Sequence, residues 1–167
     1  MERIWSPWRS QYIEAQPTAT EECFLCVAGR CTSASVKELV VATFEHWVVL
    51  LNRYPYNAGH VLIAPRAHVA VLSDLAVGAS ASFHEVLQQT VEIVTEVLHP
   101  DGVNIGLNLG AAAGAGVPGH LHWHVVPRWR GDANFMATTA DTRVISSAIE
   151  DQWLRMSKAY DDQFDDQ

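Results

Sequence analysis

The clearest pattern of hydrophobic and polar positions lies at residues 120–126, where three histidines alternate with apolar residues. Alternation with a period of two predicts a β-strand with one buried face. Other segments alternate in the same way or are rich in β-branched and aromatic residues, and they predict strands at 38–44, 47–51, 60–64 and 103–108. Apolar residues spaced three and four positions apart predict helices over about 78–99 and 142–160, the first with an N-cap region at Ser73 and Asp74. The acidic residues 161–167 predict a frayed tail.

The three histidines would share one face of their strand, while Leu121, Trp123 and Val125 face a core. Packing offers no reason to crowd three groups that titrate near neutral pH. The pattern therefore indicates a functional site, and two kinds of site are open. The imidazoles hold a metal ion, as histidines do in zinc enzymes, or one imidazole is a nucleophile and its neighbours hold an anion.

Composition limits the class of protein. A chain of 167 residues that is 49% hydrophobic predicts a single domain with a core that needs no disulfides. The formal net charge of −8 argues against general binding of nucleic acid or of an anionic membrane surface. The chain has no run of 18 apolar residues, no secretory signal at its N-terminus and an odd number of cysteines, three. We therefore expect a cytoplasmic protein in a reducing compartment.

Two cysteines near the N-terminus form a C-x-x-C pair, Cys23 and Cys26. Such a pair is half of a structural zinc site, and the alternative is two buried thiols that act as small apolar groups. The preceding residues contain Trp5, Trp8 and Tyr12, which are large apolar groups for a terminal segment. We expect this arm to pack on the body of the protein or on a partner subunit, or to dock loosely.

A loop rich in glycine and alanine, residues 109–119, leads directly into the histidine segment. A loop with almost no side chains lets a ligand approach backbone N–H groups closely, which suits an anion. Such loops also simply join strands, but the position of this one beside three histidines favours the functional interpretation.

Two motifs in this order resemble those of the histidine triad family of nucleotide-binding hydrolases and transferases. Residues 120–126 match its H-Φ-H-Φ-H-Φ-Φ motif at every position, and residues 59–68 are similar to its upstream G-H-x-L-[IV]-x-P-x-x-H pattern. The resemblance covers residues 20–136. The flanks at 5–9 and 131–136 are similar to a bacterial branch that includes diadenosine tetraphosphate phosphorylases.

The resemblance implies an α+β fold with a five-stranded antiparallel sheet, a long packed helix and, here, a C-terminal helix. The five strands expected from periodicity agree with this count. One domain overall would then consist of an N-terminal arm (1–22), a catalytic domain like that of the family (23–136), and a C-terminal helix with the acidic tail (137–167). Such proteins usually dimerise, so the resemblance also implies a homodimer.

The resemblance also implies roles for individual residues. His122 would be the nucleophile that attacks the α-phosphorus of an AMP-type nucleotide and forms a covalent nucleotidyl-histidine. His124 would donate to the phosphate oxygens, together with backbone N–H groups around Gly116 and Val117. Further matching positions would bind substrate: Asn52 for the ribose hydroxyls, His60 in the same pocket, and Asn108 for phosphate or ribose.

His120 would have a different role from the other two histidines of the motif. In similar members with an N-terminal C-x-x-C pair, a zinc ion is held by residues that match Cys23, Cys26, His68 and His120. Two sulfurs and two nitrogens form a closed tetrahedral set, which is structural and not catalytic. No organic cofactor is expected.

The chain departs from the family pattern in the loop before the motif. Many hydrolases of the family carry Gln-Ser or Gln-Thr where this chain has Gly116 and Val117, and the loop here is one residue longer. Because Val117 has no hydroxyl to donate to a leaving group, either phosphorolysis or hydrolysis of a nucleotide fits. Two alternatives are a zinc-dependent hydrolase with all three histidines on one ion, and a nucleotide-binding protein without catalysis.

Overall fold

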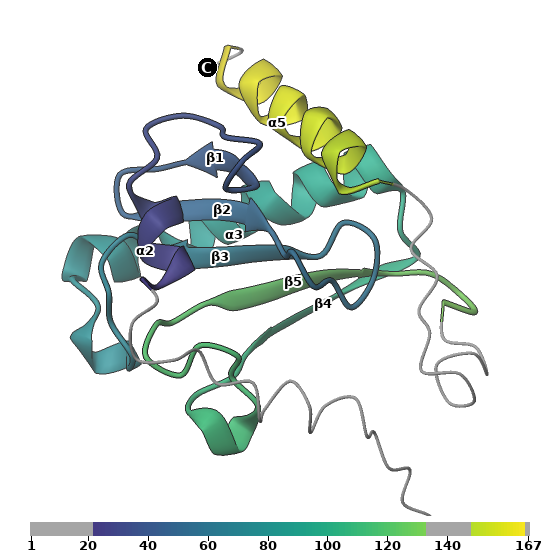
Figure 1. Ribbon diagram of the computed structural model, residues 1–167. Coiled ribbons are helices and arrows are strands. Elements are labelled where there is room, and N and C mark those ends of the chain that lie inside the picture. The colour runs from purple at the N-terminus through teal and green to yellow at the C-terminus, as the bar shows by residue number, and fades with distance from the viewer. Residues whose placement is uncertain (1–21, 133–147, 166–167) are drawn as a thin grey trace, which may run out of the picture.

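The protein folds around one antiparallel sheet of five strands (Figure 1). The computed structural model describes residues 22–132 and 148–165. The strands follow the order β1-β2-β3-β5-β4 across the sheet, and every neighbouring pair is antiparallel. Their bounds are Val40–Thr43 for β1, Trp47–Leu51 for β2, Val61–Pro65 for β3, Gly102–Leu107 for β4 and Trp123–Arg128 for β5. This architecture confirms the expected α+β fold.

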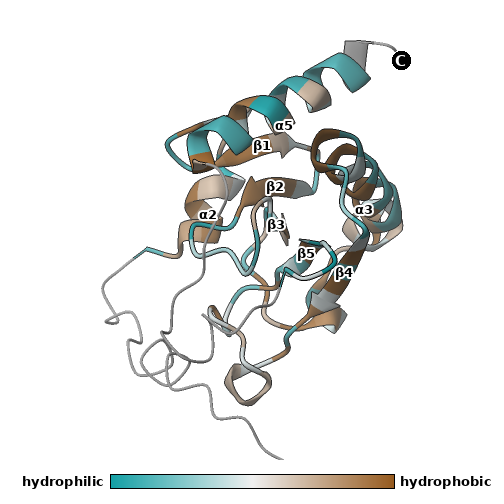
Figure 2. Ribbon diagram, turned by 90° about the vertical axis from the view of Figure 1, so that its right-hand side faces the viewer, coloured by the Kyte–Doolittle hydropathy of each residue, from teal (hydrophilic) through white to brown (hydrophobic). Residues whose placement is uncertain are grey.

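Helices cover both faces of the sheet. The long helix α3, Val77–Leu98, packs with α5, Ile149–Asp165, over a core that includes Val49, Ile63 and Val125. The short helix α2, Phe24–Gly29, covers the other face over Val48, Leu50 and Leu62. Figure 2 shows the hydrophobic residues concentrated on β1, β2 and part of α3.

Strands β2 and β3 are buried along their whole length, because residues of one parity meet α3 and those of the other meet α2. Burial on both faces explains why these strands appear in the sequence as continuous apolar runs without polar alternation. The two faces carry different parts of the molecule. His124 pairs with Leu62 and therefore lies on the α2 face of the sheet.

Several expected boundaries were wrong. The fifth strand begins at Trp123, so His120 and His122 precede the strand ladder. Leu121 instead donates its N–H to the carbonyl of Val69, outside any named strand, at 2.7 Å. The long helix begins at Val77, within one residue of the expected start, but its N-cap is Ala76, and Ser73 and Asp74 lie in a separate 3₁₀ turn.

The ends of the chain also differ from expectation. Helix α5 continues to Asp165, through most of the segment expected to fray, and α2 was not anticipated. Most of the predicted arm, 1–21, and residues 142–147 of the predicted C-terminal helix lie outside the described residues. None of the helices in the described ranges combines the length and apolar content needed to cross a bilayer.

Candidate active site and metal-binding group

Two main-chain carbonyls hold the first two histidines of the motif. The Nδ1 of His122 lies 2.8 Å from the carbonyl oxygen of His120, and the Nε2 of His120 lies 2.8 Å from that of Pro65. A carbonyl oxygen only accepts, so each of these ring nitrogens carries the hydrogen and donates it. In the neutral rings, His122 therefore has its lone pair on Nε2, and His120 has its lone pair on Nδ1.

His124 faces a histidine from the neighbouring strand. Its Nδ1 lies 3.0 Å from the Nε2 of His60, which immediately precedes β3. The Nδ1 of His60 in turn lies 3.3 Å from the Nδ2 of Asn52 and accepts the Tyr56 N–H at 3.1 Å. The ring of Tyr56 stacks on both imidazoles, with centroids 4.8 Å from His60 and 5.9 Å from His124. The structure thus brings the predicted residues Asn52, His60, His122 and His124 into one cluster.

Burial keeps these imidazoles uncharged near neutral pH. It lowers the pKa of His60 to about 3, with a further contribution from the charges of His124 and His122. Burial first, and His122 second, lower the pKa of His124 to about 4. The pKa of His122 is also lowered by burial, against an opposing effect of its hydrogen bond to the His120 carbonyl. A neutral His122 has a lone pair available for attack on an electrophile.

The four predicted metal ligands form a separate group. Cys23, Cys26, His68 and His120 each offer one ligand atom, and these atoms lie within 4.8 Å of one another. The Nδ1 of His120 is 3.4 Å from the Sγ of Cys23 and 3.5 Å from that of Cys26, and the Nδ1 of His68 is 3.1 Å from the Sγ of Cys26. Tetrahedral zinc with bonds of the usual length separates S and N ligands by about 3.5 Å.

The lone pair of His120 also fits this group. Because its Nε2–H is committed to the Pro65 carbonyl, its bare Nδ1 is the atom that faces the two sulfurs. A histidine that binds a metal usually donates the N–H of one ring nitrogen to an acceptor, and this fixes the other ring nitrogen as the ligand. Among the described residues, no group of candidate ligands includes His122 or His124. The residues present therefore fit a Cys₂His₂ metal site and do not fit one ion held by all three motif histidines.

The glycine-rich loop follows β4 and returns to the histidines. Asn108 is half-buried and comes one residue after the last β4–β5 pair, Leu107 with Trp123, at the His122 end of the ladder. Gly110 and Gly114 adopt positive φ angles of 78° and 86°, which a residue with a side chain rarely adopts. Gly116 is half-buried, and the Val117 carbonyl accepts the His120 N–H at 3.2 Å. The loop is thus hydrogen-bonded to the motif at its first histidine, His120.

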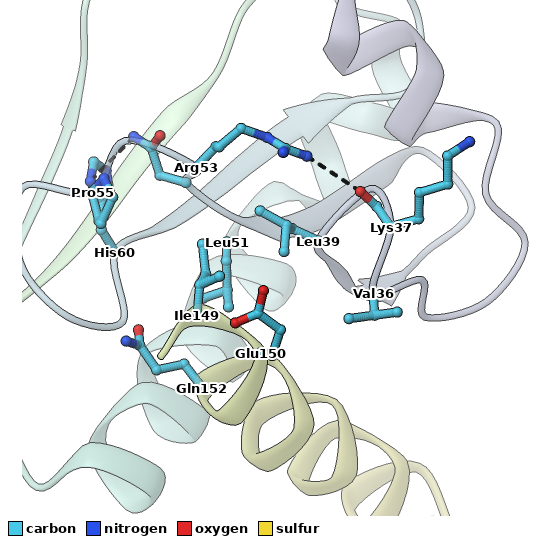
Figure 3. Close-up of a pocket in the computed structure, with 11 residues that line it drawn as sticks. Val36, Lys37, Leu39, Leu51, Arg53, Pro55, His60, Ile149, Glu150 and Gln152 are labelled. Atoms are coloured by element: carbon cyan, nitrogen blue, oxygen red, sulfur yellow. Dashed lines mark hydrogen bonds between the residues drawn. The ribbon is translucent and has the colours of Figure 1, made fainter. Parts of the chain in front are cut away.

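A cavity of about 420 Å³ borders the cluster on another side (Figure 3). It lies between the first turn of α5 and the segments that flank β1 and β2. Its apolar wall includes Leu39, Leu51 and Ile149, and neither His122 nor His124 lines it. The cavity therefore meets the histidine cluster only through His60 and Asn52.

Two contacts of the cluster could not be found from the sequence. Tyr56 contributes a backbone N–H and a stacked ring, and its place in the loop after β2 gave no sign of either. The side-chain carbonyl of the buried Gln152 in α5 accepts the N–H of Gly59, the residue before His60. A contact between residues 93 positions apart leaves no local signal.

Comparison with known proteins places this geometry in a family. The family model described as the HIT domain matches residues 33–131. An AP-4-A phosphorylase of Mycobacterium tuberculosis is 35% identical over 156 residues, which cover 90% of this chain and 80% of that protein. A bis(5'-adenosyl)-triphosphatase of Saccharomyces cerevisiae is 35% identical over 96 residues, which cover 57% of this chain and 46% of that protein.

A solved structure agrees with the sequence comparisons. A zinc-bound histidine triad family protein from Mycobacterium smegmatis has a TM-score of 0.66 and 26% identity, over 87% of this chain and 98% of that one. The family model spans more than half of the chain and contains both motifs with the full histidine cluster. The chain therefore belongs to the histidine triad (HIT) family.

Proposed function

We propose that this protein transfers the adenylyl group of a diadenosine polyphosphate to phosphate or water through a covalent intermediate on His122. The observation that carries the proposal is the hydrogen bond from His122 Nδ1–H to the His120 carbonyl. It leaves the lone pair on Nε2, and burial keeps the ring neutral by lowering its pKa. A neutral imidazole with a fixed lone pair is a competent nucleophile at pH 7.

In the first step, the Nε2 lone pair of His122 attacks the α-phosphorus. A P–N bond forms and the bond from phosphorus to the bridging oxygen breaks, so diadenosine tetraphosphate releases ATP. His124 and backbone N–H groups around Gly116 and Val117 donate to the phosphoryl oxygens, where negative charge increases. Removal of one donor of this kind costs roughly 10²–10³ in rate in other enzymes.

In the second step, an oxygen of the acceptor attacks the same phosphorus and the P–N bond breaks. Phosphate as acceptor gives ADP, whereas water gives AMP and releases one proton. The His120 carbonyl holds the hydrogen on Nδ1 throughout, so the ring is cationic while it is bonded to phosphorus. A cationic imidazole is a good leaving group, because the electron pair of the broken P–N bond makes the ring neutral.

Two asparagines near the histidines, Asn52 and Asn108, are proposed to bind substrate. Asn52 follows β2 and has a second amide hydrogen besides the one that faces His60, which suits a ribose hydroxyl. Asn108 lies near His122 at the end of the β4–β5 ladder and suits phosphate or ribose. The AP-4-A phosphorylase relative, with its match over nine-tenths of the chain, supports a diadenosine polyphosphate as the substrate class.

A zinc ion held by Cys23, Cys26, His68 and His120 is proposed as the only cofactor. The S–N distances within the group and the zinc-bound relative from Mycobacterium smegmatis support it. Four protein ligands would close the coordination sphere, so the ion would supply structure and not chemistry. It would connect α2 to the segment that carries His120.

A homodimer is proposed through the edge of the sheet at β4. Strand β4 has no partner on its outer side within the described sheet, and Ile105 on it is 48% exposed. At the other edge, α5 packs beside β1, where Trp153 donates to the Val40 carbonyl at 2.7 Å. An uncovered strand edge favours pairing with another chain. Sedimentation of the purified chain at micromolar concentration tests this proposal, and a monomer would contradict it.

The products of turnover test the proposed reaction. Diadenosine tetraphosphate should give ATP and ADP with inorganic phosphate present, and ATP and AMP in its absence. His122→Ala should abolish both reactions, whereas His84→Ala, which changes an exposed histidine on α3, should leave them unchanged. Equal turnover by wild type and His122→Ala would contradict the proposal, and so would the absence of turnover in wild type.

A further inference from the structure

The loop between β2 and β3, residues 52–60, is fastened at several points and presents His60 to His124. The Asn52 N–H donates to the His60 carbonyl at 2.8 Å and closes the loop. The Asn57 side chain donates to the Pro127 carbonyl and to Asp132, at 3.0 and 2.8 Å. These contacts tie the loop to the far end of β5, the strand that carries His124.

A glycine in this loop is also anchored to the C-terminal helix. Gly59 has a φ of 74°, and a Cβ there would collide with Leu98 of α3. Its N–H donates to the buried side chain of Gln152 in α5. Because Gly59 directly precedes His60, both helices constrain the position of that imidazole.

The hydrogen on the His60 ring follows from its neighbours. The Tyr56 N–H can only donate, so the Nδ1 of His60 is an acceptor and carries no hydrogen. The side chain of Asn52 is consistent with this assignment. Its Oδ1 accepts the Tyr54 N–H at 2.9 Å, so its Nδ2–H₂ is the group that faces the Nδ1 of His60. Burial lowers the pKa of His60 to about 3, so the ring is neutral at pH 7 and its one hydrogen is on Nε2.

This hydrogen determines the state of His124. The Nε2–H of His60 donates to the Nδ1 of His124, 3.0 Å away, so the hydrogen of the neutral His124 ring is on Nε2. The Nε2 of His124 is buried and has no hydrogen-bond partner among the described residues. A buried donor without an acceptor is unfavourable, and such atoms in native proteins call for an explanation. An oxygen of a bound phosphate would satisfy it.

Neighbouring histidines of the motif therefore have opposite tautomers. His122 carries its hydrogen on Nδ1, because the His120 carbonyl accepts there, and its Nε2 is bare. His124 carries its hydrogen on Nε2, because His60 occupies its Nδ1. The same atom, Nε2, is thus an electron-pair donor in one ring and a hydrogen donor in the next, as attack on an anionic phosphoryl group requires.

We infer that His60 is a positioning residue that fixes His124 as the Nε2–H tautomer, and that the backbone N–H of Tyr56 fixes His60 in turn. The benefit of these tautomers to the reaction rests on the proposed function, but the tautomers themselves can be measured without turnover. It replaces the expectation that His60 contacts the substrate. His60 acts on the phosphoryl group through His124.

Nuclear magnetic resonance of the ¹⁵N-labelled full-length protein tests the tautomers directly. A bare ring nitrogen resonates far downfield of one that carries hydrogen, so long-range ¹H–¹⁵N spectra distinguish the two forms. The wild type should show His60 and His124 with hydrogen on Nε2, and His122 with hydrogen on Nδ1. Hydrogen on the Nδ1 of His124 in wild type would overturn the inference without any variant.

Two substitutions separate positioning from packing. His60→Leu removes the donor, and the His124 signals should move toward a mixture of tautomers. His60→Gln keeps an N–H donor of similar reach, and it should retain the Nε2–H form of His124. An unchanged His124 spectrum in a folded His60→Leu protein would overturn the inference. If that variant does not fold, the wild-type and His60→Gln spectra decide: loss of the Nε2–H form in either contradicts it.

Steady-state kinetics with diadenosine tetraphosphate then connect the tautomer to the reaction. His60→Leu should lower kcat by roughly 10- to 100-fold with a smaller change in KM, and His60→Gln should recover part of the loss. An equal loss in both variants would show that His60 acts in another way. If the spectra agree and the wild type turns over no nucleotide, the proposed function fails and the tautomer assignment stands.

Discussion

At the scale of single residues, the chemistry of this site depends on which ring nitrogens carry hydrogen. The motif places His122 and His124 two positions apart, and the resemblance to the family implies a separate role for His120. In the structure the rings of His122 and His124 lie 5.1 Å apart, and His120 lies in the group of candidate metal ligands. The sequence could not reveal the hydrogen-bond partners that fix the tautomers. These partners are the His120 and Pro65 carbonyls and the His60 ring. Main-chain carbonyls are present at every residue, so the sequence does not indicate which of them a side chain meets.

The buried histidines predict how folding stability depends on pH. The folded pKa values of His60 and His124 are about 3 and about 4, below the value near 6.5 of an unfolded chain. Their contribution is complete above pH 6.5 and is lost as pH falls, because only the unfolded chain then binds protons. Each such histidine should lower the free energy of unfolding by about 1 kcal/mol per pH unit between about pH 6 and 5.

Urea denaturation of wild type and His60→Gln at pH 7.5, 6 and 5 checks this prediction. The variant lacks one buried imidazole, so its stability should fall less steeply with decreasing pH than that of wild type. Identical slopes for the two proteins would contradict the assignment of a depressed pKa to His60.

At the scale of elements, most helices and strands follow from periodicity, and the exceptions have tertiary causes. The alternating pattern covers residues 120–126, but the strand ladder begins only at Trp123. The N–H of Leu121 instead bonds to the carbonyl of Val69, which the sequence pattern does not reveal. Helix α2 has six residues, too few to show a helical period, and it is held by Leu25 and Ala28 against the sheet. Helix α5 extends through acidic residues because Met156 and Tyr160 bury one side of it.

The contact between α5 and the loop before β3 gives a prediction at this scale. Gln152→Leu keeps the size of the side chain but leaves the buried Gly59 N–H without an acceptor, which should cost about 1–3 kcal/mol of unfolding free energy. It should also lower kcat, because the position of His60 is less well defined. Gln88→Leu on the exposed side of α3 is the matched control and should change stability by less than about 0.5 kcal/mol. Equal effects of the two substitutions in chemical denaturation would contradict a role for α5 at the site.

At the scale of the whole molecule, the two faces of the sheet carry different parts of the structure. The α3 and α5 face carries the larger core, and the α2 face carries His124, while Cys23 and Cys26 of the metal-binding group lie at the start of α2. The resemblance of two sequence motifs to those of the histidine triad family was enough to predict this fold. The apolar runs that became β2 and β3 agreed with it, and both strands are buried along their whole length. The cavity beside α5 was not predictable, because it depends on where a helix distant in sequence packs.

Removal of the metal should lower the thermal stability of the fold and should not directly remove a group that reacts with the substrate. Purified protein should contain about one zinc per chain, and a chelator should lower the melting temperature by several degrees. Cys23→Ser should lose the zinc, whereas Cys31→Ser, outside the four-residue group, should keep it. Elemental analysis and thermal denaturation measure both effects. Full zinc content in Cys23→Ser would contradict the proposed ligand set.

The most direct measurement of the central claim is the identification of the nucleotide-bearing residue during turnover. Wild-type protein is mixed with diadenosine tetraphosphate without phosphate, quenched in alkali within milliseconds, digested and analysed by mass spectrometry. We predict one adenylyl group on the peptide that contains His122, with fragmentation placing it on that imidazole, and none in His122→Ala. Turnover with no adduct, or with the adenylyl group on another residue, would contradict the account.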